Sequence, residues 1–390
     1  MQMNDMTSNR PRIYLDNNAT TRSSSTVVDE MIRLSQTAWA NPASRHADGR
    51  AARRVLETAR ETLQRLLHAE TSQLVFTSGG TEANNLALFG LARGPRRIIA
   101  VTPGDHPSTA AAIDSLCQEG HSRIDLPIDT NGRIDPDGLA ALPWDEIGLV
   151  CVLLAHNETG VIQDVTPLAD RCAQQRIPWH VDAVQAVGKF PVDFETLGAT
   201  TLSFASHKFH GPRGIGGLLI RNGCHLTPQL FGGHQEADIR PGTESVILAA
   251  GMMVALELWQ AEATDRTTRI TALRDRFELL LQNACPPVIV HGQCVRRLPN
   301  TSNLAFPGTD GEALLVALDL AGIACSLGSA CASGSTEPAP ILLAMGCPKE
   351  IYSTSVRFSL SYETTVEEVD DAVERILRVV EQLRQSALKE

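Results

Sequence analysis

Between residues 74 and 205, short apolar runs alternate with segments in which apolar side chains recur every three or four positions. Residues 149–155 form a continuous apolar run, which is typical of a strand buried on both faces of a sheet. The pattern predicts strands at 74–77, 97–102, 149–155, 179–181 and 200–205, and helices at 49–67, 81–91, 106–117 and 166–175. Strands that alternate with helices predict a mostly parallel α/β sheet covered by helices on both faces.

The pattern changes after about residue 259. The elements predicted there are an amphipathic helix through 270–281, strands at 288–290 and 301–306, and helices near 312–319 and 366–383. Thr365 and Glu368 form a capping-box signature before the last helix. We therefore expect a large domain at 13–260, whose first residues can pack on a smaller α+β domain at 261–390. Residues 1–12 are expected to be a disordered tail.

Composition narrows the classes of function. The 390 residues carry a net charge of -11, which argues against a general nucleic-acid binder or a protein of acidic membrane surfaces. The nine cysteines are scattered without close CxxC pairs, so neither a disulfide scaffold nor a structural metal site is predicted. The sequence contains no run of about 18 apolar residues, so no membrane-spanning helix is predicted. Reduced thiols fit a cytoplasmic location.

Polar clusters stand at the ends of five predicted strands, where open α/β sheets bind their ligands. The clusters are Ser78-Gly79-Gly80-Thr81, His106, Asn157-Glu158, Asp182 with Gln185, and His207-Lys208. Each has a simpler interpretation, because a Gly-Gly pair can be a plain turn, an aspartate can cap a helix and a lysine can lie on the surface. Together they supply a phosphate cup, a carboxylate, amides, an imidazole and a lysine able to form a Schiff base, as a pyridoxal 5′-phosphate site requires.

The chain resembles the cysteine desulfurases, in the class V branch of the fold-type-I pyridoxal-phosphate enzymes. The matching motifs are Tyr14-Leu15-Asp16, Asn41-Pro42, residues 77–85, Asn157-Glu158-Thr159-Gly160, His180-Val181-Asp182-Ala183, His207-Lys208, Arg240-Pro241-Gly242-Thr243 and residues 326–334. They cover residues 13–384 in order. The resemblance implies a large cofactor-binding domain and a small domain, with a long active-site loop that hands sulfur to protein partners.

The resemblance also implies a role for each site residue. Lys208 would bind the cofactor aldehyde and move protons, Asp182 would pair with the pyridine nitrogen, and His106 would stack on the ring and assist proton transfer. Gln185 and Asn157 would bind the ring oxygen, Asn157 also lying near substrate. The phosphate contacts would come from Gly80, Thr81 and His207. Thr243 would reach the phosphate in a partner subunit, which implies a homodimer.

The small domain carries two further candidates. Cys331 lies among small residues and would be the nucleophile that takes sulfur from the substrate, whereas Cys325 fits a structural thiol better. Arg357 lies on an apolar alternating run, where it needs an anion. That anion would be the substrate carboxylate, with help from Asn41, or alternatively an Asp or Glu of the chain itself.

Several positions depart from the family pattern. Ala205 replaces a serine that contacts phosphate, so Ser206 is expected to take over this contact. The other departures are Asn18, Arg22, His156 and Leu327. None removes a chemical role, but each leaves the cofactor affinity open.

The expected reaction converts L-cysteine to L-alanine and leaves a persulfide on Cys331. The persulfide would pass to an acceptor protein, such as an iron–sulfur scaffold or a tRNA-thiolation relay. A selenocysteine lyase would need Cys331 less, another class V aminotransferase would release no sulfide, and a non-enzymatic adaptor would bind no cofactor at Lys208. Comparing the rates of the Cys331→Ala variant on cysteine and on selenocysteine distinguishes a selenocysteine lyase from a cysteine desulfurase.

Overall fold

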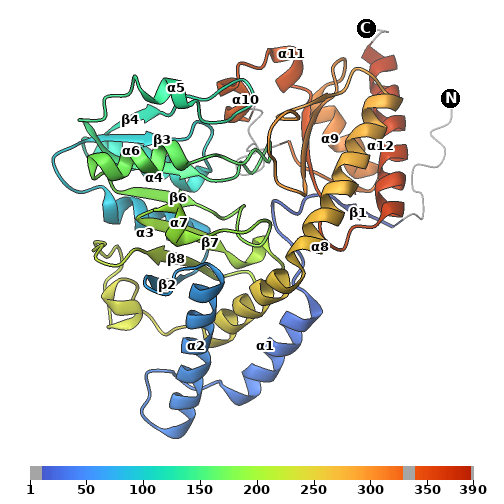
Figure 1. The fold of residues 1–390 in the computed structure, drawn as a ribbon. Helices are drawn as coiled ribbons and strands as arrows, with labels where there is room; N and C mark the ends of the chain where they lie inside the picture. The colour runs from blue at the N-terminus through green and yellow to red at the C-terminus, as the bar shows by residue number, and fades with distance from the viewer. Residues whose placement is uncertain (1–10, 328–338, 388–390) are drawn as a thin grey trace.

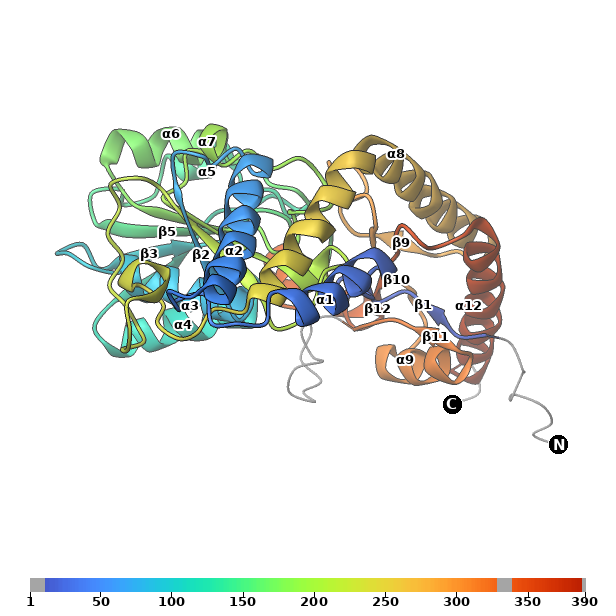
Figure 2. The ribbon, with the colours of Figure 1, turned by 90° about the horizontal axis from the view of Figure 1, so that it is seen from below.

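The computed structural model describes residues 11–327 and 339–387. Two units lie side by side, a large one built on a wide sheet and a small one beside it (Figure 1). The long helix α8 (Val246–Ala284) connects them, running from beneath the large unit to the small one in both views (Figures 1 and 2). The fold is the α/β class that the sequence predicts.

In the described part of the chain, seven strands form the large sheet in the order β2-β8-β7-β6-β5-β3-β4. Their bounds are β2 (Gln73–Thr77), β8 (Gly216–Ile220), β7 (Thr201–Ala205), β6 (Trp179–Asp182), β5 (Ile147–Leu153), β3 (Ile98–Val101) and β4 (Ser122–Asp125). Among these strands, β8 runs antiparallel to both of its neighbours, β2 and β7, and the other pairs are parallel. The prediction of a mostly parallel sheet is confirmed.

Strand β8 is absent from the predictions because its glycines look like a loop in the sequence. In the sheet, however, a Cβ on Gly217 would lie 2.3 Å from the ring of Phe204 on β7. The strand thus needs a residue without a side chain here to pair closely with β7. The exposed, polar strand β4 at the sheet edge was also missed.

Helices cover both faces of the sheet. Along β5, Val150 and Val152 point into one apolar core, and Leu149 and Cys151 point into another. The helices of the large unit are α1 (Ser25–Thr37), α2 (Ala47–Leu66), α3 (Gly80–Leu91), α4 (Pro107–Gln118), α5 (Pro136–Leu139), α6 (Thr166–Gln175) and α7 (Phe194–Leu197). Of these, α3 and α4 cover one face, while α2 and α6 cover the other with the first half of α8.

The small unit is built on the antiparallel strands β12-β10-β9. Its elements are β9 (Ile289–Val290), β10 (Thr301–Ala305), α9 (Gly311–Leu320), β11 (Ile323–Ala324), α10 (Pro340–Ala344), α11 (Lys349–Tyr352), β12 (Ser355–Ser359) and α12 (Val366–Ala387). Strand β1 (Ile13–Tyr14) joins this unit, because it pairs with β11. The capping box is confirmed: the Thr365 N–H donates to Glu368 Oε2 (2.9 Å), and the Glu368 N–H donates to Thr365 Oγ1 (3.1 Å).

Helix α8 begins earlier than the sequence pattern indicated, so the expected domain boundary at residue 260 falls inside it. Its 39 residues are long and apolar enough in part to cross a membrane, by length and composition alone. In the structure, the apolar first half packs against α1 and α2 as a core helix. Burial on several sides explains why this half shows no helical period in the sequence.

Candidate active site

The carboxyl ends of the parallel strands open into a cavity of about 300 Å³. Eight of the predicted site residues line it: Gly80, Thr81, His106, Asn157, Asp182, Gln185, His207 and Lys208. Ala19, Asn84, Ser108, Leu153, Val184 and Ala205 complete the lining. Residues from five strand ends meet here because parallel strands end at the same edge of a sheet.

Lys208 ends the short 3₁₀ turn Ser206–Lys208 that follows β7. Its Nζ donates hydrogen bonds to the main-chain oxygens of Asn18 (2.6 Å) and Ala19 (2.9 Å). Burial, together with the charge of Arg357, lowers the pKa of Lys208 from 10.5 to about 8, although Asp182 and Asp16 act in the opposite direction. A substantial fraction of this amine is therefore uncharged at mildly alkaline pH, as a nucleophile requires.

This lowered pKa predicts that Lys208 of the cofactor-free protein reacts early with an amine-directed reagent. Labelling should rise with a midpoint near pH 8, whereas an ordinary lysine titrates near 10.4. Peptide mass spectrometry after brief labelling at a series of pH values measures both. Lys349, which is exposed, provides the internal comparison. A midpoint for Lys208 near the ordinary value would show that its surroundings do not disfavour the charged form.

Asp182 ends β6 and is held in a buried network. It accepts hydrogen bonds from Asn84 Nδ2 (2.7 Å) and from the Val184 N–H (2.9 Å). On the other side of the amide, Asn84 Oδ1 accepts from Ser203 Oγ (2.5 Å) and lies 3.0 Å from His180 Nε2. Burial lowers the pKa of His180 to about 3, so this imidazole is neutral. Because the atom that faces it is the acceptor Asn84 Oδ1, its hydrogen lies on Nε2. The network fixes the direction of the carboxylate.

Asn84 and His180 act behind Asp182, and neither was among the predicted site residues. Asn84 lies in the first turn and a half of α3, three residues after Thr81. The signal that could have identified it is its position between Ala83 and Leu86 on the apolar side of the helix, because a buried amide requires partners.

His106 is the N-cap of α4. Its Nδ1 accepts from the Ser108 N–H (3.1 Å), and burial lowers the pKa of the imidazole. The ring is thus neutral, with its hydrogen on Nε2. Behind it, burial and the charge of Asp182 raise the pKa of the Asp105 carboxyl well above its usual value. A neutral imidazole beside the cavity can donate or relay a proton.

The N-terminus of α3 forms one end of the cavity with Gly80 and Thr81. A Cβ on Gly80 would lie 2.7 Å from Val184, and a Cβ on Gly216 would lie 2.8 Å from Gly79. The glycines therefore allow β8 and the turn after β6 to approach the helix start. The first N–H groups of a helix have no partner within the helix, and they attract anions.

The expectation for Ser206 is corrected. Ala205, at the end of β7, lines the cavity, whereas Ser206 is fully buried and does not. The Ser206 hydroxyl lies against Gly211, where a Cβ would come within 2.0 Å of Oγ. The backbone leaves the strand between these two residues, and the hydroxyl points away from the site. The end of the cavity at the N-terminus of α3 therefore lacks the Ser206 hydroxyl.

Three other predicted residues do not line the cavity of a single chain. Thr243 is exposed, and Asn41 is exposed with its Oδ1 accepting from the Ala43 N–H (2.8 Å). Arg357 is buried beside the cavity, and its Nη1 lies 3.3 Å from the main-chain oxygen of Asn157. Cys331 lies outside the described residues.

Arg357 already binds carboxylates of its own chain, which is the alternative that the sequence left open. Its Nη1 donates to Glu158 Oε1 (2.8 Å) and its Nη2 to Asp16 Oδ1 (2.8 Å). Burial raises the pKa of Glu158, although the charge of Arg357 acts against this. The Asp16 side chain retains 21% of its exposure, against 3% for Glu158. Asp16 is therefore the carboxylate that can turn to solvent more easily.

Comparisons with known proteins agree with this geometry. Residues 13–372 match the family described as Aminotransferase class-V. The chain is 40% identical to the cysteine desulfurase NifS of Azotobacter vinelandii, over 95% of this chain and 93% of the relative. It is 38% identical to the cysteine desulfurase IscS of Dictyoglomus turgidum, over 95% of each chain.

Solved structures give the same result. A NifS-like protein superposes with a TM-score of 0.89 at 32% identity, over 95% of this chain and 100% of the other. A NifS-like protein of Rickettsia africae gives a TM-score of 0.86 at 30% identity, over 95% and 99% of the two chains. The chain belongs to the class V aminotransferase family, in its cysteine desulfurase branch.

Proposed function

We propose that this cysteine desulfurase converts L-cysteine to L-alanine with Lys208 as its base, and that it passes the sulfur on as a persulfide of Cys331. The observation that carries the proposal is the convergence of Lys208, Asp182, His106 and the start of α3 on one cavity. The family implies dependence on pyridoxal 5′-phosphate. A solved relative described as "SspA in complex with cysteine", 26% identical with a TM-score of 0.78 over 90% of this chain, supports cysteine as the substrate.

The residues present fit this cofactor. The start of α3 offers free N–H groups for a phosphate, with Thr81 and His207 beside them, and the fixed carboxylate of Asp182 suits a protonated ring nitrogen. Lys208 would hold the aldehyde carbon, His106 would cover the ring, and Gln185 and Asn157 would bind the ring oxygen. When bound, the cofactor supplies the electron sink that stabilises negative charge on the substrate α-carbon.

The side chains of the protein handle the protons. Lys208 Nζ, with its lowered pKa, takes the proton from the substrate α-carbon and can return it to the product. The neutral His106, with its hydrogen on Nε2, is placed to assist this transfer. Asn84 and the Val184 N–H keep the Asp182 carboxylate in one orientation during these steps.

Arg357 would bind the substrate carboxylate. Glu158 and Asp16 already accept from its two Nη atoms, so a substrate carboxylate would either share the guanidinium with them or displace one of them. Asp16 is the more exposed, and the raised pKa of Glu158 lets that residue take up a proton as a third carboxylate arrives. Asn41 would assist only if the exposed loop that carries it approaches the site.

A homodimer fits the surface around Thr243. Phe231 is 92% exposed and Leu230 is 50% exposed on the same segment. Glu236, Ala237 and Asp238 all have positive φ angles, and the buried Glu236 is held by Arg60 Nη1 (2.8 Å) and by the Phe76 N–H (2.9 Å). Such strain persists where the surrounding structure fixes the backbone. Thr243 would reach the cavity of a second subunit from this segment.

The sulfur acceptor would be a protein such as an iron–sulfur scaffold, and neither nucleic acid nor membrane is expected as a partner. The proposed location is the cytoplasm, because the scattered cysteines of the sequence fit a reducing compartment.

Mass spectrometry of the purified enzyme after incubation with L-cysteine tests the proposal. We expect one added sulfur atom on the peptide that contains Cys331, together with release of L-alanine. The matched control is Cys347→Ser, which removes a half-buried thiol of the same unit and should leave both signals unchanged. Cys331→Ser should lose the added sulfur and alanine release. Undiminished alanine release by this variant would assign the nucleophile elsewhere, and transamination without sulfur transfer would contradict the proposed reaction.

A further inference from the structure

Lys189 is a buried lysine to which the mechanism above gives no role. It lies in the turn after β6 and is 7% exposed. Its Nζ donates to Gln185 Oε1 (2.5 Å) and to Asn18 Oδ1 (2.7 Å). Lysines are almost never fully buried unless they are paired with an opposite charge. Within residues 11–327 and 339–387, no carboxylate forms an ion pair with Lys189, and both of these acceptors are neutral amides.

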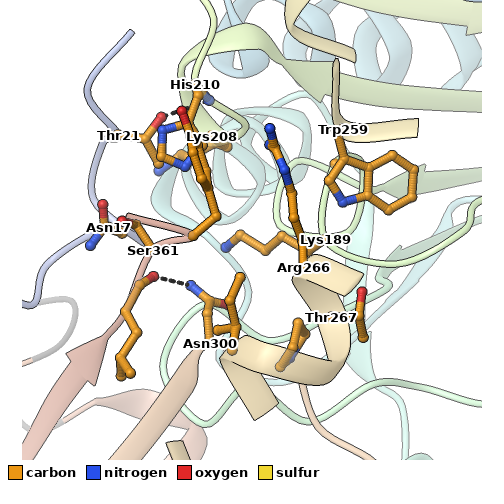
Figure 3. Close-up of a pocket in the computed structure, with 15 residues that line it drawn as sticks. Asn17, Thr21, Lys189, Lys208, His210, Trp259, Arg266, Thr267, Asn300 and Ser361 are labelled. Carbon is orange, nitrogen blue, oxygen red and sulfur yellow. Dashed lines mark hydrogen bonds between the residues drawn. The ribbon is translucent and has the colours of Figure 1, made fainter. Parts of the chain in front are cut away.

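The amine lies at a second, smaller cavity of about 40 Å³ behind Lys208. Figure 3 shows the side chain of Lys189 extending into this cavity between Arg266 and Asn300, with Lys208 on the far side. The lining contains no aspartate or glutamate. The volume is too small for an amino acid or a cofactor, because ligand pockets usually measure several hundred Å³. The reason for Lys189 therefore lies in what its hydrogen bonds hold.

These hydrogen bonds determine how the amide of Gln185 is oriented. Since Oε1 receives a hydrogen bond from Lys189, the Nε2 end must face the other way, where it donates to the main-chain oxygen of Asn18 (2.9 Å). Gln185 also lines the main cavity. Its second N–H is thus left for an acceptor there, and the reversed amide would set an oxygen in its place.

Lys189 also supports Lys208, through Asn18. The main-chain oxygen of Asn18 accepts from both Gln185 Nε2 and Lys208 Nζ. Asn18 Oδ1 accepts from Lys189 Nζ and from Asn300 Nδ2 (3.1 Å), while Asn18 Nδ2 donates to Thr301 Oγ1 (2.8 Å) and to the main-chain oxygen of Asn157 (3.0 Å). Lys189 is therefore one of the groups that hold the turn on which the amine of Lys208 rests.

We propose that Lys189 is a positioning residue, which presents the nitrogen of the Gln185 amide to the cofactor oxygen and holds Asn18 against Lys208. The proposal rests on the proposed function, since it uses the cofactor roles of Gln185 and Lys208. It does not depend on the protonation state of Lys189. A neutral amine still has two N–H groups, which is the number that Gln185 and Asn18 require.

Burial of this amine is costly for folding. Burial and the charges of Lys208 and Arg357 lower the pKa of Lys189 well below its usual value. Its replacement by an apolar side chain removes this cost but takes the donor away from the buried Gln185 Oε1, and an unsatisfied buried acceptor is itself destabilising. The two effects on stability oppose each other, so cofactor affinity is the measurement that separates positioning from packing.

The test is a double-mutant cycle of Lys189→Met and Gln185→Ala. Pyridoxal 5′-phosphate affinity is measured by fluorescence titration of the cofactor-free protein, and thermal unfolding is recorded alongside. Lys189→Met should weaken binding about tenfold, because one oriented hydrogen bond is lost, and the thermal unfolding curve shows that the variant is folded. In the Gln185→Ala background the same substitution should change affinity less than about twofold. Lys349→Met, at an exposed position, is the matched control and should change nothing.

Two results would overturn the proposal. One is additivity of the two substitutions, which would show that Lys189 does not act through Gln185. The other is a lowered Tm with unchanged cofactor affinity, which would assign Lys189 to packing alone. Hydrogen exchange of residues 16–21 in the cofactor-free protein gives a readout that needs no cofactor. Its rate should rise in Lys189→Met and should not rise in the control Lys349→Met. Failure of the proposed function would show separately, as absence of cofactor binding by the unsubstituted enzyme.

Discussion

Replacement of Lys208 by methionine is expected to lower kcat/KM for L-cysteine by at least about 10⁴-fold, because one residue supplies both the covalent anchor and the base. Methionine keeps the length of the side chain but has no amine. Its sulfur cannot replace the two hydrogen bonds to the turn at Asn18 and Ala19. Alanine release under saturating and limiting cysteine measures the effect.

The Lys208→Met variant should remain folded, which makes the loss interpretable. Removing a buried amine with a lowered pKa takes away a desolvation cost, so the Tm of the cofactor-free protein should stay the same or rise. Lys349→Met controls for the loss of a lysine in general. Activity within about tenfold of the unsubstituted enzyme would mean that another amine does this work.

Replacement of Arg357 by methionine is expected to destabilise the cofactor-free protein by about 3–5 kcal/mol, because it leaves a buried carboxylate without its counter-charge. Glu158 keeps only 3% of its side-chain exposure and cannot reach water, whereas Asp16 can. The free energy of unfolding from urea titration measures the effect. Where the single variant does not accumulate, the double variant Arg357→Met with Glu158→Gln provides the measurement. Its free energy of unfolding should be at least about 2 kcal/mol higher than that expected for Arg357→Met alone.

The stability of Arg357→Met should also depend on pH with a definite sign. The pKa of Glu158 is already raised in the folded protein, and loss of Arg357 removes the charge that opposes this. The folded state then binds more protons than the unfolded state above the usual glutamate pKa. Stability should thus fall as pH rises and recover towards pH 5. Equal stability of the variant and the parent at pH 8 would show that the ion pairs contribute nothing.

The sequence by itself determined the framework and most of the cavity. Alternating apolar runs and helical periods located five of the seven described strands of the large sheet. The polar residues that follow those strands had to meet, because parallel strands end at one edge. For this reason Lys208, Asp182, His106 and Thr81 were identified before any contact was known. The ordered motifs then named the cysteine desulfurases.

Only the tertiary structure decided how the groups are held. Arg357 meets Asp16 and Glu158 across 341 and 199 positions of the chain, and no local period records such contacts. Asn84 sits in a helix and Lys189 in a turn, and each also has a partner in a distant element, His180 for Asn84 and Asn18 for Lys189.

The direction of a side chain where a strand ends was also beyond the sequence. Ser206 turns away from the cavity because the backbone leaves β7 at Ala205, which depends on φ and ψ rather than on residue type. Helix α8 conceals the boundary between the units, because its buried first half has no polar face. Local pattern thus located most of the buried strands and the amphipathic helices, while packing between distant elements decided the glycine-rich strand β8, the start of α8 and which polar groups face one another.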